Sequence, residues 1–105
     1  MYGSIFNLSV KQGHEEALIE SFDERIPEDA VAWFVMKPDD QDRDLIGIAV
    51  FKSKEAYTSN ANSPEQHEAF MKLMNHLNSE PTWTDGEYII AVSYTHLTLP
   101  TILLV

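Results

Sequence analysis

The stretch over residues 51–88, FKSKEAYTSNANSPEQHEAFMKLMNHLNSEPTWTDGEY, decides the fold of this chain. It predicts the end of a strand, a short helical turn over 53–59 and a long amphipathic helix from Ser63 to about Ser79. Serine followed by proline and an acidic residue is a typical helix start. After Glu80-Pro81 a new strand is expected over 83–91. The stretch therefore predicts a strand, two helical segments and a return strand.

The residues before this stretch predict a matching first half. Residues 2–10 have strand composition, residues 14–24 carry a helical apolar stripe, and two strands follow over 30–37 and 44–51. The short acidic loop between those two strands predicts an antiparallel hairpin. The order β-α-β-β-α-β is the ferredoxin-like arrangement of the α+β class.

The two strands of the hairpin are apolar on both faces, and this pattern predicts a homodimer. Strand 30–37 alternates Val31, Trp33 and Val35 with Ala32, Phe34 and Met36, and strand 44–51 shows the same composition on its two faces. An antiparallel sheet with one face in water alternates apolar and polar residues instead. Two helices cover one face only, so a second copy of the chain is expected on the other.

With MYGSIFNLSVKQGHEEAL as its opening strand and first helix, the chain resembles the antibiotic biosynthesis monooxygenase (ABM) family over residues 1–91. These proteins are dimeric α+β barrels. The resemblance implies cofactor-independent oxygenation of a small aromatic molecule (a phenol, anthrone or quinol) by dioxygen. The family also holds members with no known activity, so a non-catalytic small-molecule-binding dimer is the alternative.

The last fourteen residues, 92–105 (the tail), are expected to be an artefact. The run VSYTHLTLPT at 92–101 resembles one translated frame of a sequencing adapter, and all charged residues of the chain lie before it. The domain is therefore expected to comprise residues 1–91, with the tail extending the last strand by accident.

Composition excludes several classes of function. The net charge of −10 argues against a nucleic acid or an anionic membrane as partner, because both require a basic patch. The absence of cysteine excludes thiolate catalysis, cysteine-ligated zinc and disulfides. No signal-peptide core and no apolar run of about 20 residues is present, so a cytoplasmic location is expected.

Two polar residues at positions where the pattern expects apolar ones are the catalytic candidates. Asn7 lies in the first strand, and the competing interpretation is a structural amide bonded to the backbone. His67 lies at the edge of the apolar stripe of the long helix, where it is either a base for a phenolic substrate or a packed, half-exposed histidine. His76 is expected to be exposed, and His14 to lie at the pocket rim.

Aromatic and methionine side chains are expected to wall a substrate pocket between the sheet and the helices, although in so small a chain they are also expected as core. They are Trp33, Phe34, Tyr57, Phe70, Met71, Met74 and Trp83. The acidic clusters at 15–16 and 39–44 lack an EF-hand spacing and predict solvated surface, so no metal is expected. A haem-handling relative is the third possibility, and such relatives combine an asparagine on the first strand with a tryptophan and an iron-ligating histidine on the later helices. Asn7 matches the asparagine. No tryptophan occurs between Tyr57 and Leu77, however, and His67 lies about one turn from the position of the iron ligand. No cofactor is therefore expected.

Overall fold

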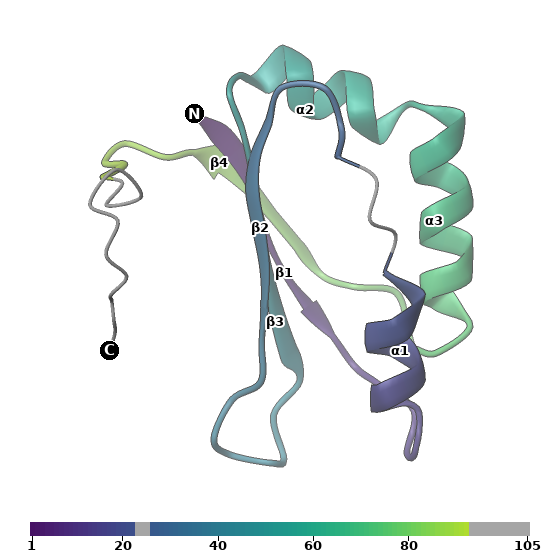
Figure 1. The fold of residues 1–105 in the computed structure, drawn as a ribbon. Helices are drawn as coiled ribbons and strands as arrows, with labels where there is room; N and C mark the ends of the chain where they lie inside the picture. The colour runs from purple at the N-terminus through teal and green to yellow at the C-terminus, as the bar shows by residue number, and fades with distance from the viewer. Residues whose placement is uncertain (23–25, 93–105) are drawn as a thin grey trace, which may run out of the picture.

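The computed structural model describes residues 1–22 and 26–92, which form one four-stranded sheet with three helices on one side of it (Figure 1). The elements are β1 (Tyr2–Leu8), α1 (Glu15–Ser21), β2 (Ala30–Met36), β3 (Leu45–Phe51), α2 (Lys54–Ala61), α3 (Pro64–Met74) and β4 (Trp83–Glu87). The predicted ferredoxin-like α+β order is confirmed, with α2 as the short helical segment before the long helix.

The sheet has the order β2-β3-β1-β4, and every neighbouring pair is antiparallel. Residues directly opposite each other in such a pair point to the same face. Leu8 pairs with Leu45, and Phe6 pairs with both Gly47 and Trp83, so these side chains share the face that the helices cover. Asn7 pairs with Ile46 and therefore lies on the opposite face, which we call the open face.

The helix starts follow the predicted capping chemistry. The Ser53 hydroxyl accepts a hydrogen bond from the Ala56 amide at the start of α2 (3.1 Å). The Ser63 hydroxyl accepts one from the Gln66 amide at the start of α3 (3.1 Å), and Pro64 takes the first helical position. A serine cap satisfies an amide that has no partner inside the helix, which is why both helices begin where the sequence predicts.

Several elements end earlier than predicted. The long helix stops at Met74 rather than near Ser79, because the next residues leave the helix to pair with the segment after β1: Val10 forms a bridge with Leu77, and the Asn78 amide donates to the Ser9 carbonyl (2.8 Å). The first strand ends at Leu8 for the same reason. The last strand ends at Glu87, which pairs with Tyr2, the first residue of its partner β1. The tail was predicted to extend this strand, but its residues from 93 onward lie outside the described part of the chain.

The core lies where β1 and β3 meet α1 and the end of α3. Leu8, Leu18, Leu45 and Leu77 are its buried members. Partly buried side chains pack around them: Phe6, Val10, Phe22, Val35, Leu73 and Met74. Truncating a buried leucine in a core this small costs about 2–5 kcal/mol.

The open face carries large apolar side chains in the single chain. Phe34 and Met36 of β2 are 60% and 51% exposed, and Ile5 of β1 is 45% exposed. Ile46, Ile48 and Val50 of β3 lie between them in register and are only partly buried. A soluble monomer rarely leaves so continuous an apolar surface uncovered.

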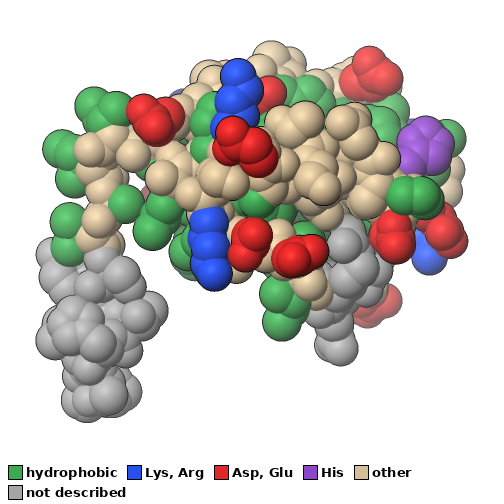
Figure 2. Space-filling model, turned by 90° about the horizontal axis from the view of Figure 1, so that it is seen from above, with side chains coloured by type: hydrophobic (Ala, Val, Ile, Leu, Met, Phe, Trp, Pro, Cys, Tyr) green, Lys and Arg blue, Asp and Glu red, His purple; other side chains and the backbone are tan. Residues whose placement is uncertain are grey.

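The charged residues are dispersed. Acidic side chains are scattered over the face that Figure 2 shows rather than gathered in one patch. Two ion pairs occur among the described residues, Lys37 with Glu15 (3.0 Å) and Lys52 with Asp29 (3.5 Å), and both are exposed. Exposed pairs of this kind contribute little stability. Among the helices that the structure describes, none is long and apolar enough to span a membrane.

Candidate functional site

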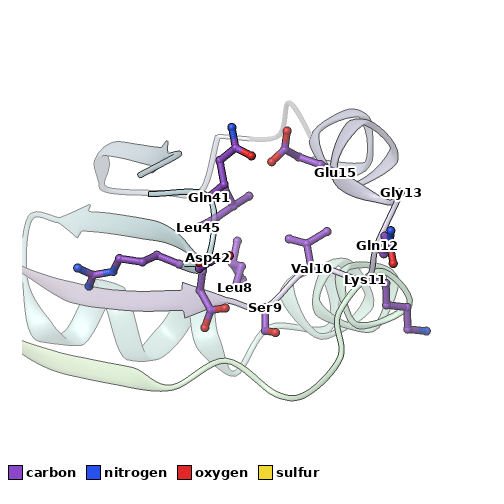
Figure 3. A pocket seen from close by; sticks show the side chains of 12 residues that line it. Leu8, Ser9, Val10, Lys11, Gln12, Gly13, Glu15, Gln41, Asp42 and Leu45 are labelled. Carbon is purple, nitrogen blue, oxygen red and sulfur yellow. The ribbon is translucent and has the colours of Figure 1, made fainter. Parts of the chain in front are cut away.

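A hollow of about 330 Å³ lies between the end of β1, the turn before α1 and the loop between β2 and β3 (Figure 3). Three apolar side chains line it, those of Leu8, Val10 and Leu45, and the rest of its lining is mostly polar and charged. Figure 3 shows Glu15, Gln41 and Val10 around the hollow, with the Lys11 side chain pointing away from it. A second hollow of about 210 Å³ adjoins it on the side of Lys37 and Pro38.

Sequence reasoning treated these rim residues as solvated surface and missed the hollow. It forms because the β1–α1 turn and the β2–β3 loop, about thirty residues apart, come together in the fold. Hydrophobic periodicity reports which face of one element is buried, so it carries no signal for a hollow between two loops.

Three aromatic side chains lie together on the helix-covered side of β4, and two of them, Phe70 and Trp83, are among the residues predicted for the pocket. The Trp83 ring lies 4.7 Å from the Phe6 ring and 6.4 Å from the Phe70 ring of α3, measured between ring centroids. We call these three residues the Trp83 group. Although they face the helices, Trp83 remains 44% exposed. An aromatic surface that is held in place yet half open is suited to stacking on a planar ligand.

Tyr57 of α2 lies near the Trp83 group along β4. Its hydroxyl donates to the Asp85 carboxylate (2.9 Å), and its ring packs against Tyr2 and Phe51. Burial, together with the nearby Asp85 carboxylate, raises the pKa of Tyr57 to about 12, and a hydrogen bond with Ser4 partly opposes this shift. Tyr57 is therefore a hydrogen-bond donor at neutral pH and not a base.

The Asn7 amide is bonded at both ends. Its nitrogen donates to the Asp44 carboxylate (2.7 Å), and its oxygen accepts from the Thr82 amide (2.6 Å). Asn7 thus ties the start of β3 and the segment before β4 to β1. This arrangement fits the competing interpretation of a structural amide.

The other predicted site residues are spread over the fold. Trp33 packs on Phe22 of α1 (5.2 Å between centroids), at the opposite edge of the sheet from Trp83. Three strand spacings, about 14 Å, separate these edges, so one small ligand does not reach both tryptophans. Phe34 lies on the open face, Met71 is exposed and Met74 packs on the core.

His67 is exposed in the first half of α3 and lines neither of the two hollows. Since Asn7 lies on the open face and α3 lies on the other side of the sheet, a single chain does not bring the two catalytic candidates to one pocket.

His76 departs from its prediction. It was expected to be exposed, but it is partly buried, and its Nδ1 lies 3.2 Å from the Nδ1 of His14. The early end of α3 turns His76 toward the β1–α1 turn. No group of three metal-ligating side chains occurs within residues 1–22 and 26–92.

Comparison with solved structures identifies the fold. One neighbour, an antibiotic biosynthesis monooxygenase, matches with a TM-score of 0.70 and 10% identity over 86% of this chain and 100% of its own. Rv0793 from Mycobacterium tuberculosis matches with a TM-score of 0.72 and 14% identity, over 88% of this chain and 98% of its own. At3g17210 from Arabidopsis thaliana matches at 0.67 and 20% identity, over 89% and 99%.

No protein-family model matches the chain, and a search of curated proteins gives no match either. The structural likeness nevertheless covers nearly the whole of the neighbouring chains. The chain therefore has the ferredoxin-like α+β fold of proteins described as antibiotic biosynthesis monooxygenases, as its sequence predicts.

Proposed function

We propose that this chain belongs to the antibiotic biosynthesis monooxygenase family and acts as a homodimeric, cofactor-independent monooxygenase on a small phenol, anthrone or quinol. One observation carries the proposal: the half-exposed Trp83 ring, which packs on Phe6 and Phe70 on the helix-covered face of the sheet. The likeness to proteins described as antibiotic biosynthesis monooxygenases supports the reaction class.

The binding step follows from the neighbours of Trp83. Trp83 and Asp85 point to the same face of β4, two residues and about 7 Å apart. A planar substrate stacked on Trp83 and Phe70 brings its hydroxyl toward Asp85, whose carboxylate accepts one hydrogen bond from Tyr57 and has capacity for another. The aromatic surface supplies affinity, and the Tyr57–Asp85 pair supplies orientation.

The oxygenation step relies on the substrate as reductant. A deprotonated anthrone carbon transfers electrons to dioxygen, one oxygen atom enters the substrate and the other leaves as water. The protein then contributes orientation, exclusion of water and hydrogen bonds to the charged intermediate. In this proposal His67 accepts the substrate proton from the outer edge of α3, and Asn7 acts by holding β4, and with it Trp83, in place.

The homodimer is proposed from the open face. Ile5, Phe34 and Met36 remain exposed there in one chain, and the same face of a second copy would cover them. Such an interface is isologous, so the same side chains are covered in both copies and each contact occurs twice in the dimer.

A specific observation favours a second candidate, a small-molecule-binding dimer without catalysis. Both ends of the Asn7 amide are bonded within the protein, and His67 lines neither hollow. In this alternative the Trp83 group still binds the aromatic ligand, but no proton is removed from it.

Tryptophan fluorescence tests the binding step, because the chain has only two tryptophans. In Trp33→Phe the remaining signal comes from Trp83, and saturable quenching by a hydroquinone or anthrone is expected. In Trp83→Phe, the matched variant, quenching should be lost. Quenching of Trp33 alone would refute the proposed site.

Dioxygen uptake with the same compounds, without added cofactor, separates the two candidates. An oxygenase consumes dioxygen, and His67→Ala abolishes most of the turnover while leaving quenching intact. Saturable quenching without dioxygen uptake would establish the binding dimer instead. Titration with haem serves as the control for the haem-handling possibility, and a Soret shift at stoichiometric haem would contradict both candidates.

A further inference from the structure

We propose that His14 and His76 form a binding site for a divalent transition-metal ion of the zinc type, with both imidazoles ligating through Nδ1. The two residues are 62 positions apart in the sequence, and their Nδ1 atoms are 3.2 Å apart. This site is separate from the Trp83 group and does not depend on the proposed oxygenase function.

The distance between the two nitrogens fits a tetrahedral ion. Two imidazole nitrogens bound to zinc at 2.0–2.1 Å and at the tetrahedral angle are about 3.3 Å apart. The ring planes are inclined at 56°, so the rings are not stacked on each other. Binding of one ion by both rings requires them to rotate about χ2 until both lone pairs point to it.

The backbone, and not the side chains alone, holds the two rings together. The Lys11 amide donates to the His76 carbonyl (2.9 Å), and the His14 amide donates to the Lys11 carbonyl (2.9 Å). The bridge between Val10 and Leu77 fixes the same two segments from the other side. A site whose ligands are positioned before the ion arrives loses less conformational entropy on binding.

The protonation of the pair also favours an ion. A neutral imidazole carries a proton on one nitrogen only, so the short contact between two Nδ1 atoms requires one of them to be the donor. A metal ion replaces that proton and satisfies both nitrogens at once.

The charges around the pair are mixed, and the Lys11 ammonium beside His76 opposes a cation. The Lys11 ammonium is directed to the Asn75 carbonyl (3.2 Å), and Glu15, next to His14, is paired with Lys37 (3.0 Å). The chain as a whole carries a net charge of −10. Within the part of the chain that the structure describes, no third histidine, aspartate or glutamate joins the pair, so water or an added ligand completes the coordination. The site is therefore open, and weaker than a three-residue zinc site.

Isothermal titration of the full chain with Zn²⁺ tests this inference. All proteins carry His96→Ala, because His96 lies in the tail and offers a third imidazole. One Zn²⁺ per chain is expected for the parent and for His67→Ala, the matched exposed histidine of α3. His14→Ala and His76→Ala should each weaken binding at least tenfold. Mg²⁺, which prefers oxygen ligands, should not bind.

Nitrogen NMR of the imidazoles keeps the test decisive if an alanine variant fails to fold. In the parent, Zn²⁺ should shift the Nδ1 resonances of His14 and His76 and leave those of His67 in place, and acidification to about pH 5 should reverse the shift because protons compete for the same nitrogens. Equal affinity in all variants, the absence of saturable binding, or a shift of His67 would overturn the proposal. The proposal would also be overturned if mutation of either histidine lowered the stability of the protein but Zn²⁺ never bound.

Discussion

Phe34→Ala is expected to weaken the proposed dimer strongly. Phe34 is 60% exposed on the open face of the single chain. For a phenylalanine of about 200 Å² this leaves about 120 Å² to be covered by the partner. At about 25 cal/mol per Å² the covered area is worth about 3 kcal/mol per subunit.

The alanine side chain keeps about one third of that value, so the substitution removes about 2 kcal/mol per subunit. Because the proposed interface is isologous, the loss occurs twice and reaches about 4 kcal/mol per dimer. Since about 1.4 kcal/mol corresponds to a factor of ten, the dimer dissociation constant should rise about a thousandfold.

Sedimentation velocity over a dilution series measures this change directly. Ile19→Ala is the matched control, because Ile19 is also a large exposed apolar residue, at 50%, but lies on α1 and not on the open face. Its dissociation constant should remain that of the parent. A parent protein that sediments as a monomer at every concentration, or two variants that dissociate alike, would show that the open face is not the interface.

Three further predictions concern stability. Gly47→Ala should lower the free energy of unfolding by about 1–3 kcal/mol, because the new methyl group collides with the Phe6 ring. In the control Gly86→Ala the methyl group meets no atom within 4 Å, so the thermal midpoint should stay nearly unchanged. Similar midpoints for the two variants would refute the steric argument. Ser63→Ala removes the cap of α3 and should lower the free energy of unfolding by about 1 kcal/mol, which corresponds to a fall of about 4–8 °C in the thermal midpoint. A fall below about 1 °C would show that the cap contributes little. The raised pKa of Tyr57 makes a stabilising contribution that is present below pH 10 and is lost as the pH rises toward about 12. Urea denaturation at alkaline pH should therefore show a smaller fall in stability for Tyr57→Phe than for the parent. Equal falls in the two proteins would contradict the role given to burial.

The fold could be predicted because its determinants are local. Ser63 and Pro64 mark the start of α3 by capping chemistry, and the two-faced apolar strands mark the hairpin of β2 and β3. The ends of the elements could not be predicted, because α3 stops at Met74 in response to the Val10–Leu77 bridge, a contact that no helical periodicity reports.

The site was predicted less completely for the same reason. Two of the residues predicted for the pocket, Trp83 and Phe70, lie 6.4 Å apart between ring centroids, although Trp83 shares its face of β4 with Asp85 and Glu87. Trp33 carries the same composition signal, yet it lies at the other edge of the sheet, and only the strand order determines that. The contact between His14 and His76 depends on a turn geometry at the end of α3 that the residue types do not specify.

The bonds between Asn7 and Thr82 affect how the chain folds during synthesis. They join residues 75 positions apart, and β1 needs β4 as its second neighbour. A ribosome adding 5–20 residues per second takes about 4–15 s to cover that distance. Through this interval β1 has an unpaired edge next to an incomplete apolar layer, a state that is prone to aggregation. The yield of native protein should therefore depend on chaperones that shield the nascent chain until β4 has left the exit tunnel.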